Sequence, residues 1–275
     1  MNRDHAEQLT TKALDELASA LEAGSSRRLT EYLAAMARFH RYSFRNALMI
    51  AAQRPAATHV AGFQAWKKLG RYVRKGEKAI AIIAPIVGRA DSSECSDTEV
   101  RGFRVAHVFD VEQTEGNSLP ELATISGDPG EATGRLREVI ASKGIELRYE
   151  DYLCGALGRS KGGVIEVLSS LSPAQEFEVL THELAHEILH KRDGSEPMPP
   201  EGVRELEAEA VAFAVSSGIG LDGLASSHDY VGLYRGSKEA LLQSLERIQS
   251  TATEILRALL PPTDAKAIEP ESRAA

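Results

Sequence analysis

The residues best suited to chemistry form a His-Glu-x-x-His pattern, at His182, Glu183 and His186. The four residues at 172–175 (SPAQ) have the form of a capping box with proline at the first helical position, so the pattern is expected on a helix. Residues four apart on a helix share a face, which lets both imidazoles bind one zinc ion (Zn2+). Glu183 is then placed to take a proton from a zinc-bound water, as the base of a hydrolase.

A tetrahedral zinc site needs a third protein ligand, and two segments are candidates for it. His190 continues the four-residue spacing but lies one turn further along the same helix, where it cannot easily reach the same ion. The segment RELEAEAVAF at 204–213 places Glu205 and Glu209 on one helical face. Glu205 is therefore the expected third ligand, and Glu209 is expected to orient a ligand histidine. The alternative interpretation of this segment is a solvated stripe of glutamates.

Positive charge is concentrated in the N-terminal part of the chain. Residues 27–78 hold twelve Lys and Arg against two Glu, a local formal charge of +10 in a protein whose net charge is -8. A basic segment within an otherwise acidic chain indicates a module that faces an anionic partner.

Cations alternate with aromatic residues in this segment, as they do on surfaces that bind single-stranded DNA, where cations follow the phosphates and rings stack on bases. Tyr42 and Tyr72, flanked by arginines, are the expected stacking residues, whereas Phe44, Phe63 and Trp66 are expected in the core. The candidate DNA-binding residues are Arg41, Tyr42, Arg45, Lys67, Lys68, Arg71, Tyr72, Arg74, Lys75 and Lys78. An acidic insertion at 90–100 would lower DNA affinity if it folds near the basic face.

The composition is that of a globular protein, because 43% of the 275 residues are apolar and 26% are charged. No apolar run approaches the roughly 18 residues that span a bilayer, and the polar first residues do not resemble a signal peptide. Two cysteines, Cys95 and Cys154, lack the spacing of a metal knuckle or a disulfide framework. A soluble, cytoplasmic protein without a membrane partner is expected.

Hydrophobic periodicity and turn residues predict an α+β protein with a helical and β-rich N-terminal domain and a mostly helical second domain. Helices are expected at 4–23, 28–40, 43–53, 62–69, 131–143, 173–191, 202–218 and 237–260, and strands at 79–87, 103–109, 145–149 and 163–168. The Gly-, Pro- and Ser-rich stretch 114–132 separates the domains 1–125 and 133–260. Residues 261–275 are expected to be a disordered tail.

Two resemblances to known families follow from these motifs. HELAH followed by RELEAEAVAF resembles the ImmA/IrrE group of zinc metallopeptidases, over roughly residues 133–260. In that group a Glu-x-x-Ala-(Asn/Asp/Glu) helix supplies the third ligand, and Glu205 matches it here. The segment GRSKGGVIEV is similar to the edge strand that lies beside the active site in that group. The resemblance implies a zincin-like fold and does not identify the substrate.

The N-terminal part resembles the single-strand-binding domain of ArdC-type antirestriction proteins, over about residues 8–115. The resemblance lies in YSFRNALMIAAQRP, GFQAWKKLGRYVRKGEKAIAIIAPI and VFDVEQT. Proteins of that type join this domain to a metallopeptidase-like domain, are typically encoded on mobile elements and are associated with protecting incoming DNA from restriction. The resemblance implies the same role for this chain.

The leading hypothesis is thus a single-stranded-DNA-binding protein with a zinc metalloendopeptidase domain that acts on an unidentified protein substrate. Tyr230, in the segment 228–234, is the first candidate for steadying the oxyanion. Two alternatives stay open. One is a regulatory metalloprotease that cleaves a repressor, and the other is a DNA-binding protein whose zinc site is structural or vestigial.

Overall fold

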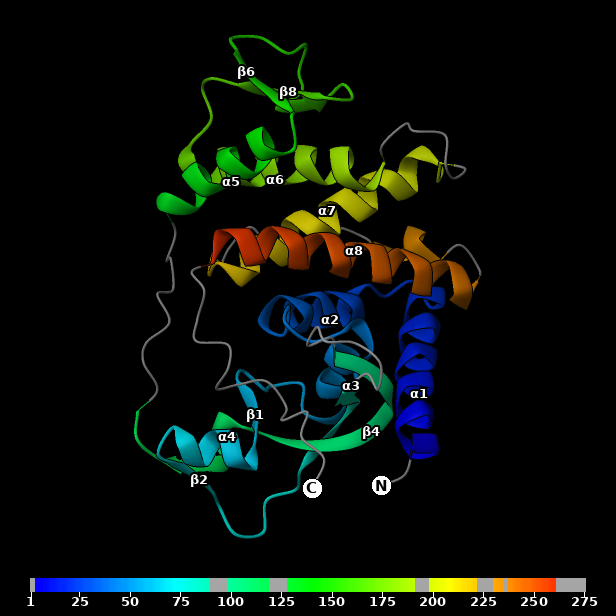
Figure 1. The fold of residues 1–275 in the computed structure, drawn as a ribbon. Coiled ribbons are helices and arrows are strands. Elements are labelled where there is room, and N and C mark those ends of the chain that lie inside the picture. The colour runs from blue at the N-terminus through cyan, green and yellow to red at the C-terminus, as the bar shows by residue number, and fades with distance from the viewer. Residues whose placement is uncertain are drawn as a thin grey trace. The chain divides into compact units, whose positions relative to one another are not determined.

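Figure 1 shows the computed structural model, which describes residues 3–89, 98–118, 128–190, 198–221, 230–234 and 237–260. Helices and strands are mixed along the chain, and the α+β class expected from the sequence is confirmed. The described residues divide into two compact units. Unit 1 comprises Met1–Leu14 and Arg45–Pro120, and unit 2 comprises Asp15–Phe44 and Glu121–Pro262. No helix of the described residues has both the length and the apolar character that a membrane span requires.

Unit 1 is built on an antiparallel sheet in the strand order β1-β4-β3, accompanied by a separate ribbon of β2 and β5. Its core contains the single tryptophan of the chain, Trp66, whose indole N–H donates to the Phe109 carbonyl at 2.8 Å. The elements are α1 (Arg3–Glu22, shared with unit 2), α3 (Phe44–Gln53), β1 (Val60–Gly62), α4 (Phe63–Lys68), β2 (Arg71–Val73), β3 (Ile80–Arg89), β4 (Thr98–Asp110), η1 (Val111–Gln113) and β5 (Thr114–Gly116).

Helix α3 covers the open edge of strand β3 with two side-chain amides. Asn46 donates to the Ile83 carbonyl at 2.7 Å and accepts from the Ile83 N–H at 2.8 Å. Gln53, two turns further along the helix, makes the same pair of bonds with Ala81, at 2.8 and 2.9 Å. Residues 81 and 83 present their backbone groups on the same side of the strand, so the two amides take the place of a fourth strand.

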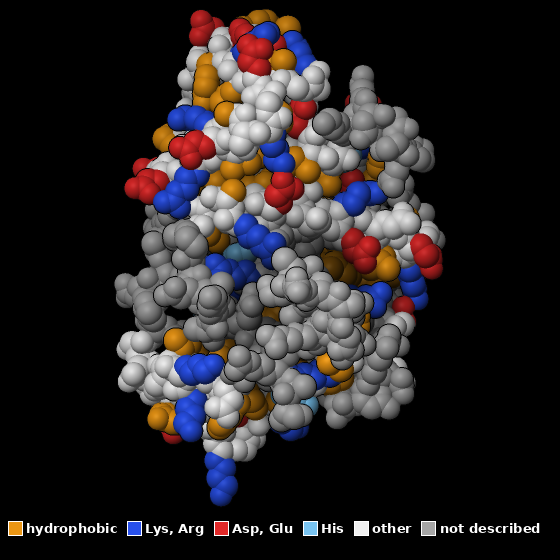
Figure 2. All heavy atoms as spheres, in the orientation of Figure 1, with side chains coloured by type: hydrophobic (Ala, Val, Ile, Leu, Met, Phe, Trp, Pro, Cys, Tyr) orange, Lys and Arg blue, Asp and Glu red, His pale blue; other side chains and the backbone are white. Residues whose placement is uncertain are grey.

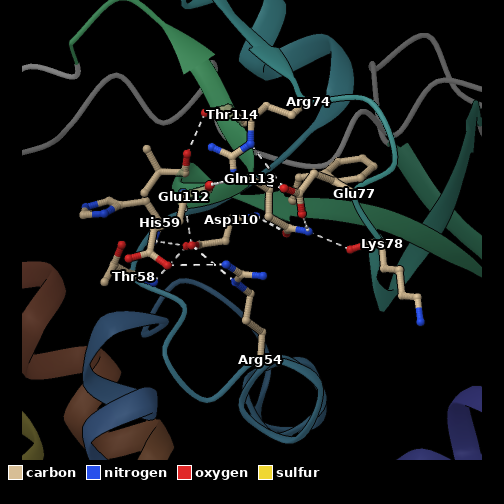
Figure 3. A network of polar contacts seen from close by, with 12 residues as sticks. Arg54, Thr58, His59, Arg74, Glu77, Lys78, Asp110, Glu112, Gln113 and Thr114 are labelled. Carbon is tan, nitrogen blue, oxygen red and sulfur yellow. Dashed lines mark hydrogen bonds and ion pairs between the residues drawn. The ribbon is translucent and has the colours of Figure 1, made fainter.

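A buried carboxylate organises the end of β4 (Figure 3). Asp110 is fully buried and accepts hydrogen bonds from the backbone N–H groups of Thr58, His59 and Glu112, at 2.9, 3.1 and 3.2 Å. Arg54 lies 3.5 Å from the carboxylate and pairs with it. This arrangement satisfies a charge that would otherwise be costly to bury. One of the twelve cations of the basic segment therefore has a structural role.

Unit 2 packs helices and a small sheet in layers (Figure 1). The sheet has the order β6-β8-β7, with β6 parallel to β8 and the short strand β7 antiparallel to it at the edge. Helices α5 and α6 lie beneath the sheet, and α7 lies between α6 and the pair formed by α2 and α8. The elements are α2 (Arg27–Arg38), α5 (Glu131–Ser142), β6 (Glu146–Glu150), β7 (Gly158–Ser160), β8 (Val164–Leu168), α6 (Pro173–Leu189), α7 (Glu201–Gly218), η2 (Tyr230–Tyr234) and α8 (Lys238–Leu259).

The central position of α7 follows from its side chains. Its buried face carries Ala208, Ala210, Val211 and Ala214, all at 0% exposure. Small side chains allow neighbouring helices to approach closely, so α7 can be surrounded on several sides.

Helix α2 belongs to unit 2 although it precedes the predicted boundary of the domains 1–125 and 133–260. Its apolar residues Leu29, Leu33 and Met36 are buried at 0–1% exposure within unit 2. The Tyr32 hydroxyl donates to the Gln249 side chain of α8 at 3.4 Å. The structure thus groups residues 15–44 with the C-terminal helices, because the amphipathic face of α2 packs there.

The predicted helices and longer strands have counterparts in the structure, with ends that differ by up to five residues. The three-residue strands β1, β2, β5 and β7 were not anticipated, since such short segments carry little periodic signal. The predicted disordered tail 261–275 and residues 90–97 of the acidic insertion lie outside the described residues.

Candidate functional site

The His-Glu-x-x-His pattern lies on α6, which begins as the sequence indicates. Ser172 accepts a hydrogen bond from the Gln175 N–H, the Gln175 side chain returns to the Ser172 backbone, and Pro173 is the first helical residue. The apolar face of the helix is buried through Phe177 and Leu184, both at 0% exposure. This packing fixes the rotation of α6 about its axis and thereby the direction of its histidines.

Three potential ligand atoms converge between α6 and α7. One atom each from His182, His186 and Glu205 lies within 4.8 Å of the other two. The two Nε2 atoms are 3.0 Å apart, and Glu205 Oε2 lies 3.6 Å from His182 Nε2 and 3.5 Å from His186 Nε2. Helices α6 and α7 pack against each other. The structure therefore brings together the three ligands expected from the sequence.

The spacing of these atoms fits a tetrahedral ion. Ligands bound at about 2.0–2.1 Å in a tetrahedron are about 3.3 Å from one another. The three observed separations, 3.0, 3.5 and 3.6 Å, lie close to this value. The Glu205 side chain is 56% exposed, so solvent reaches the cluster from one side. The donor set of two imidazoles and a carboxylate therefore suits a divalent metal with an open fourth position.

Glu183 lies beside the cluster, packed under the edge strand β7. Gly158 makes this packing possible, because a Cβ atom there would lie 2.4 Å from Val179 Cγ1 and 2.9 Å from Glu183 Oε1. Burial raises the pKa of Glu183 to about 7. The charge of Glu205 also raises this pKa, whereas His182 and a hydrogen bond from the Ser160 backbone lower it. A carboxyl group with a pKa near neutrality can both accept and return a proton.

The two histidines have contrasting electrostatic environments. Burial and the neighbouring His182 lower the pKa of His186 to about 4, which favours the neutral imidazole that a metal requires. For His182, burial acts to lower the pKa, but Glu209, Glu183 and Glu205 outweigh it and the pKa is raised. Glu209 Oε2 lies 3.5 Å from His182 Nδ1. Glu209 therefore lies where a carboxylate could orient the ring of His182.

Two residues around the cluster went unnoticed in the sequence. Glu187 accepts from the Ser160 hydroxyl at 2.5 Å and from the Gly162 and Gly163 N–H groups at 2.8 and 2.7 Å, so it holds the β7–β8 turn against α6. Glu207 is fully buried on the opposite side of α7 from Glu205. The alternation of glutamates at 205, 207 and 209 is the available signal, because positions two apart on a helix face different directions.

His190 and Tyr230 lie outside the ligand cluster. His190 follows the last residue of α6, and its side chain is 3% exposed and contacts Glu207. This placement agrees with the expectation that His190 is not a ligand. Tyr230 begins η2 and is buried at 1% exposure. Its proposed action on an oxyanion stays a prediction.

The candidate DNA-binding residues fall into both units. Arg41 and Tyr42 belong to unit 2, and Tyr42 is half-buried, which raises its pKa to about 12. Tyr72 in unit 1 is 55% exposed, as expected of a stacking residue. Phe63, expected in the core, is 51% exposed, whereas Trp66 is buried as expected. Phe63 is the first residue of α4, and its ring is open to solvent.

The cations of unit 1 are also divided between two roles. Arg71 bonds the Thr114 side chain and the Asn117 carbonyl, and Arg74 pairs with Glu77 at 2.9 Å. The other exposed cations of the segment in unit 1 are Arg45, Lys67, Lys68, Lys75 and Lys78. On the face drawn in Figure 2, most of the acidic side chains that can be seen lie in the upper part of the view, and the coloured side chains in the lower part are mainly basic or hydrophobic.

Comparison with known proteins gives independent information. Residues 4–115 match the family described as the N-terminal domain of anti-restriction factor ArdC. An uncharacterized protein of Bacillus anthracis is 25% identical over 276 positions, which cover 82% of this chain and 46% of that protein. This chain therefore spans about half the length of the curated relative that it matches.

Two solved structures share the fold. They are the metal-free and Mn(II)-bound forms of the antirestriction ArdC protein from plasmid R388. The metal-free form is 18% identical with a TM-score of 0.52, and the Mn(II)-bound form is 19% identical with a TM-score of 0.54. Each comparison covers 91% of this chain and 97% of the ArdC chain. The likeness therefore extends through both units.

Proposed function

We propose that this chain is an antirestriction protein of a mobile element, with a single-stranded-DNA-binding surface on unit 1 and a zincin-like zinc metallopeptidase centre of the ImmA/IrrE type in unit 2. The convergence of three ligand atoms beside Glu183 carries the proposal for unit 2. The ArdC match of residues 4–115 supports the proposal for unit 1.

His182, His186 and Glu205 would hold the ion. Bound there, a divalent ion supplies Lewis acidity toward a peptide carbonyl and lowers the pKa of water. Glu183 takes the proton of the attacking water and later gives it to the leaving amine, a task for which a pKa of about 7 is suited. The β7 strand, held by Glu187 and open at the sheet edge, offers backbone groups to an extended peptide substrate.

Metal analysis of the purified chain tests the centre in unit 2. We expect about one zinc per chain, which His182→Ala loses and Glu205→Gln binds more weakly. Glu183→Gln should keep the metal and lose peptide hydrolysis, because the base is changed and the ligands are not. Glu201→Gln, a substitution on an exposed part of α7, is the matched control. Stoichiometric zinc in His182→Ala would refute the ligand assignment, and wild-type metal binding without cleavage of any tested protein would refute the peptidase.

The DNA surface is proposed around α4 and β2, where two exposed aromatic rings accompany exposed lysines. Phe63 and Tyr72 are 51% and 55% exposed, and Lys67 and Lys68 lie on α4 between them in sequence. Base–aromatic stacking contributes about 1–3 kcal/mol per base, and lysines add contacts to phosphates that depend on salt.

Oligonucleotide titration of the full-length protein tests this surface. Residues 15–44 pack in unit 2, so a fragment ending near residue 125 would expose the apolar face of α2. Phe63→Ala and Tyr72→Ala should each weaken single-strand binding by about 5- to 160-fold, which is the stacking energy expressed as an equilibrium constant. Duplex binding should change less. Tyr152→Ala removes a 76% exposed ring from unit 2 and is the control. Equal losses on single strands and duplex would contradict the stacking.

A further inference from the structure

Behind the metal cluster, His190 joins a potential ligand to a buried carboxylate. Its Nδ1 atom lies 3.1 Å from Nδ1 of His186, and its Nε2 atom lies 3.0 Å from Oε2 of Glu207. His186 directs its other nitrogen, Nε2, at the cluster. The three side chains thus form a continuous line from the cluster into the core of unit 2.

The line ends at a charge on a third helix. Arg247 of α8 donates to Oε1 of Glu207, whose side chain is 0% exposed. The buried carboxylate therefore has a partner on each of its oxygens, His190 at Oε2 and Arg247 at Oε1. Helices α6, α7 and α8 each contribute one member to this arrangement.

Metal binding at the cluster would determine where the hydrogens lie along this line. If His186 binds a metal through Nε2, its Nδ1 must carry a hydrogen and donate it. Nδ1 of His190 is then the acceptor, and the remaining hydrogen of His190, on Nε2, is donated to Glu207. Each donor along the line faces one acceptor, and the line as a whole selects the His186 tautomer whose Nε2 lone pair points at the cluster.

We propose that His190 and Glu207 are positioning residues that fix the ring and tautomer of His186 for metal binding, with Arg247 holding Glu207 in place. The inference rests on the proposed metal site and assigns it residues beyond the three ligands. Partners behind a metal-bound histidine typically change metal affinity by about 10- to 100-fold when they are mutated.

A purely structural role would require a different arrangement of hydrogens. A doubly protonated His190 would pair with Glu207 as a buried ion pair that joins α6 to α7. Its Nδ1–H would then need an acceptor at Nδ1 of His186, which would place the His186 hydrogen on Nε2 and obstruct metal binding. The tautomer of His186 therefore separates the two roles.

Long-range 1H–15N NMR of the metal-free, full-length protein reports this tautomer without any mutation. We expect His186 to carry its hydrogen on Nδ1, and a hydrogen on Nε2 would overturn the inference even if metal binds elsewhere in the chain. In His190→Ala the Nδ1 preference should disappear.

Chelator competition with Zn2+ and with Mn2+ then measures affinity. His190→Ala and Glu207→Gln should bind about 10- to 100-fold more weakly than wild type. His190→Asn should bind within a few-fold of wild type, because its Oδ1 can replace Nδ1 as the acceptor from His186. His190→Leu, which has the branching of asparagine but no acceptor, should not restore binding, and this difference separates positioning from bulk packing.

The outcomes are distinguishable from failure of the metal site itself. If wild type binds no metal, the proposed centre fails, while the NMR tautomer still decides the role of His190. If wild type binds metal and His190→Ala and Glu207→Gln bind it within twofold, the centre stands and the positioning role is wrong. Circular dichroism of each metal-free variant identifies any that do not fold.

Discussion

Replacing Asn46 by Asp should destabilise unit 1 strongly, although the two side chains have nearly the same shape. Asn46 is 7% exposed and forms two hydrogen bonds with the backbone of Ile83, at 2.7 and 2.8 Å. An aspartate can still accept from the Ile83 N–H. It directs a charged oxygen at the Ile83 carbonyl, however, where the amide had a donor. The carbonyl is left without a partner and the buried anion without compensation.

The magnitude follows from the two groups affected. A buried backbone group that loses its partner costs about 1–3 kcal/mol, and burying a carboxylate adds to this, so we expect a loss of about 2–4 kcal/mol. Gln53→Glu disturbs the same pattern at Ala81 but at a half-buried side chain, so its loss should be smaller, about 1–2 kcal/mol. Gln64→Glu makes the same amide-to-carboxylate change on an exposed residue of α4, and it should stay within about 0.5 kcal/mol.

Urea unfolding followed by the fluorescence of Trp66 measures these changes in the full-length protein. Trp66 is the single tryptophan and is 2% exposed in the core of unit 1, so its signal reports that unit. A shift of the midpoint with an unchanged slope reports stability. Hydrogen exchange at the Ala81 and Ile83 amides should increase in the same variants. An Asn46→Asp midpoint equal to that of Gln64→Glu would show that the amides do not protect the edge of β3.

Three further predictions concern unit 2. Gly158→Ala should cost about 1–3 kcal/mol of stability by calorimetry, because the new Cβ would lie 2.4 Å from Val179 Cγ1, and adding Val179→Ala should recover part of that loss. Burial lowers the pKa of His40 in the folded state, so the unfolded chain binds the proton at a higher pH than the folded chain does. The free energy of unfolding should therefore fall as pH drops below about 6.5. His40→Gln should make the urea midpoint depend less on pH between pH 7 and 5.5. Glu187→Gln should speed hydrogen exchange at the Gly162 and Gly163 amides without loss of metal, and unchanged exchange would contradict its role in holding that turn.

The sequence was informative where the structure is local. The capping box at 172–175 and the apolar period of α6 predicted both the start of the helix and the common direction of His182 and His186. Helix α7 was equally predictable. Its alanine-rich face is buried, and Glu205 and Glu209 share another face that is not. In each case a period of 3.6 residues determines which side chains face the neighbouring helix.

The sequence was uninformative where the structure depends on contacts between distant segments. The apolar face of α2 predicts that the helix is packed, but not that its neighbours are α7 and α8, more than 160 residues later. Asn46 and Gln53 belong to a segment whose cations suggested DNA binding, yet their amides are used within the fold. Polar residues carry no periodic signal for the partner that satisfies them, so such pairs emerge from the tertiary structure.

The division of the basic segment between the two units reduces the number of its cations that the proposed DNA surface on unit 1 can use. Of its twelve cations, Arg27, Arg28, Arg38 and Arg41 lie in unit 2, and eight lie in unit 1. Arg54 is paired with the buried Asp110, and the β2–β5 region engages two further arginines, as described above. The other five cations of the segment on unit 1 are exposed and face solvent, where the DNA surface is proposed.

This count predicts the salt dependence of single-strand binding. Each phosphate neutralised on a single strand contributes about 0.7 to the slope of log affinity against log salt concentration, so five cations predict a slope no steeper than about −3.5. The eight cations named from the sequence alone would give about −5.6. Titration of a labelled oligonucleotide over a series of salt concentrations distinguishes the two values. Lys67→Ala should reduce the slope by about 0.7, whereas Arg54→Ala should lower stability and leave the slope unchanged, because its charge is used by Asp110. A wild-type slope steeper than about −5 would mean that residues of unit 2, or arginines now bound within unit 1, also reach the phosphates.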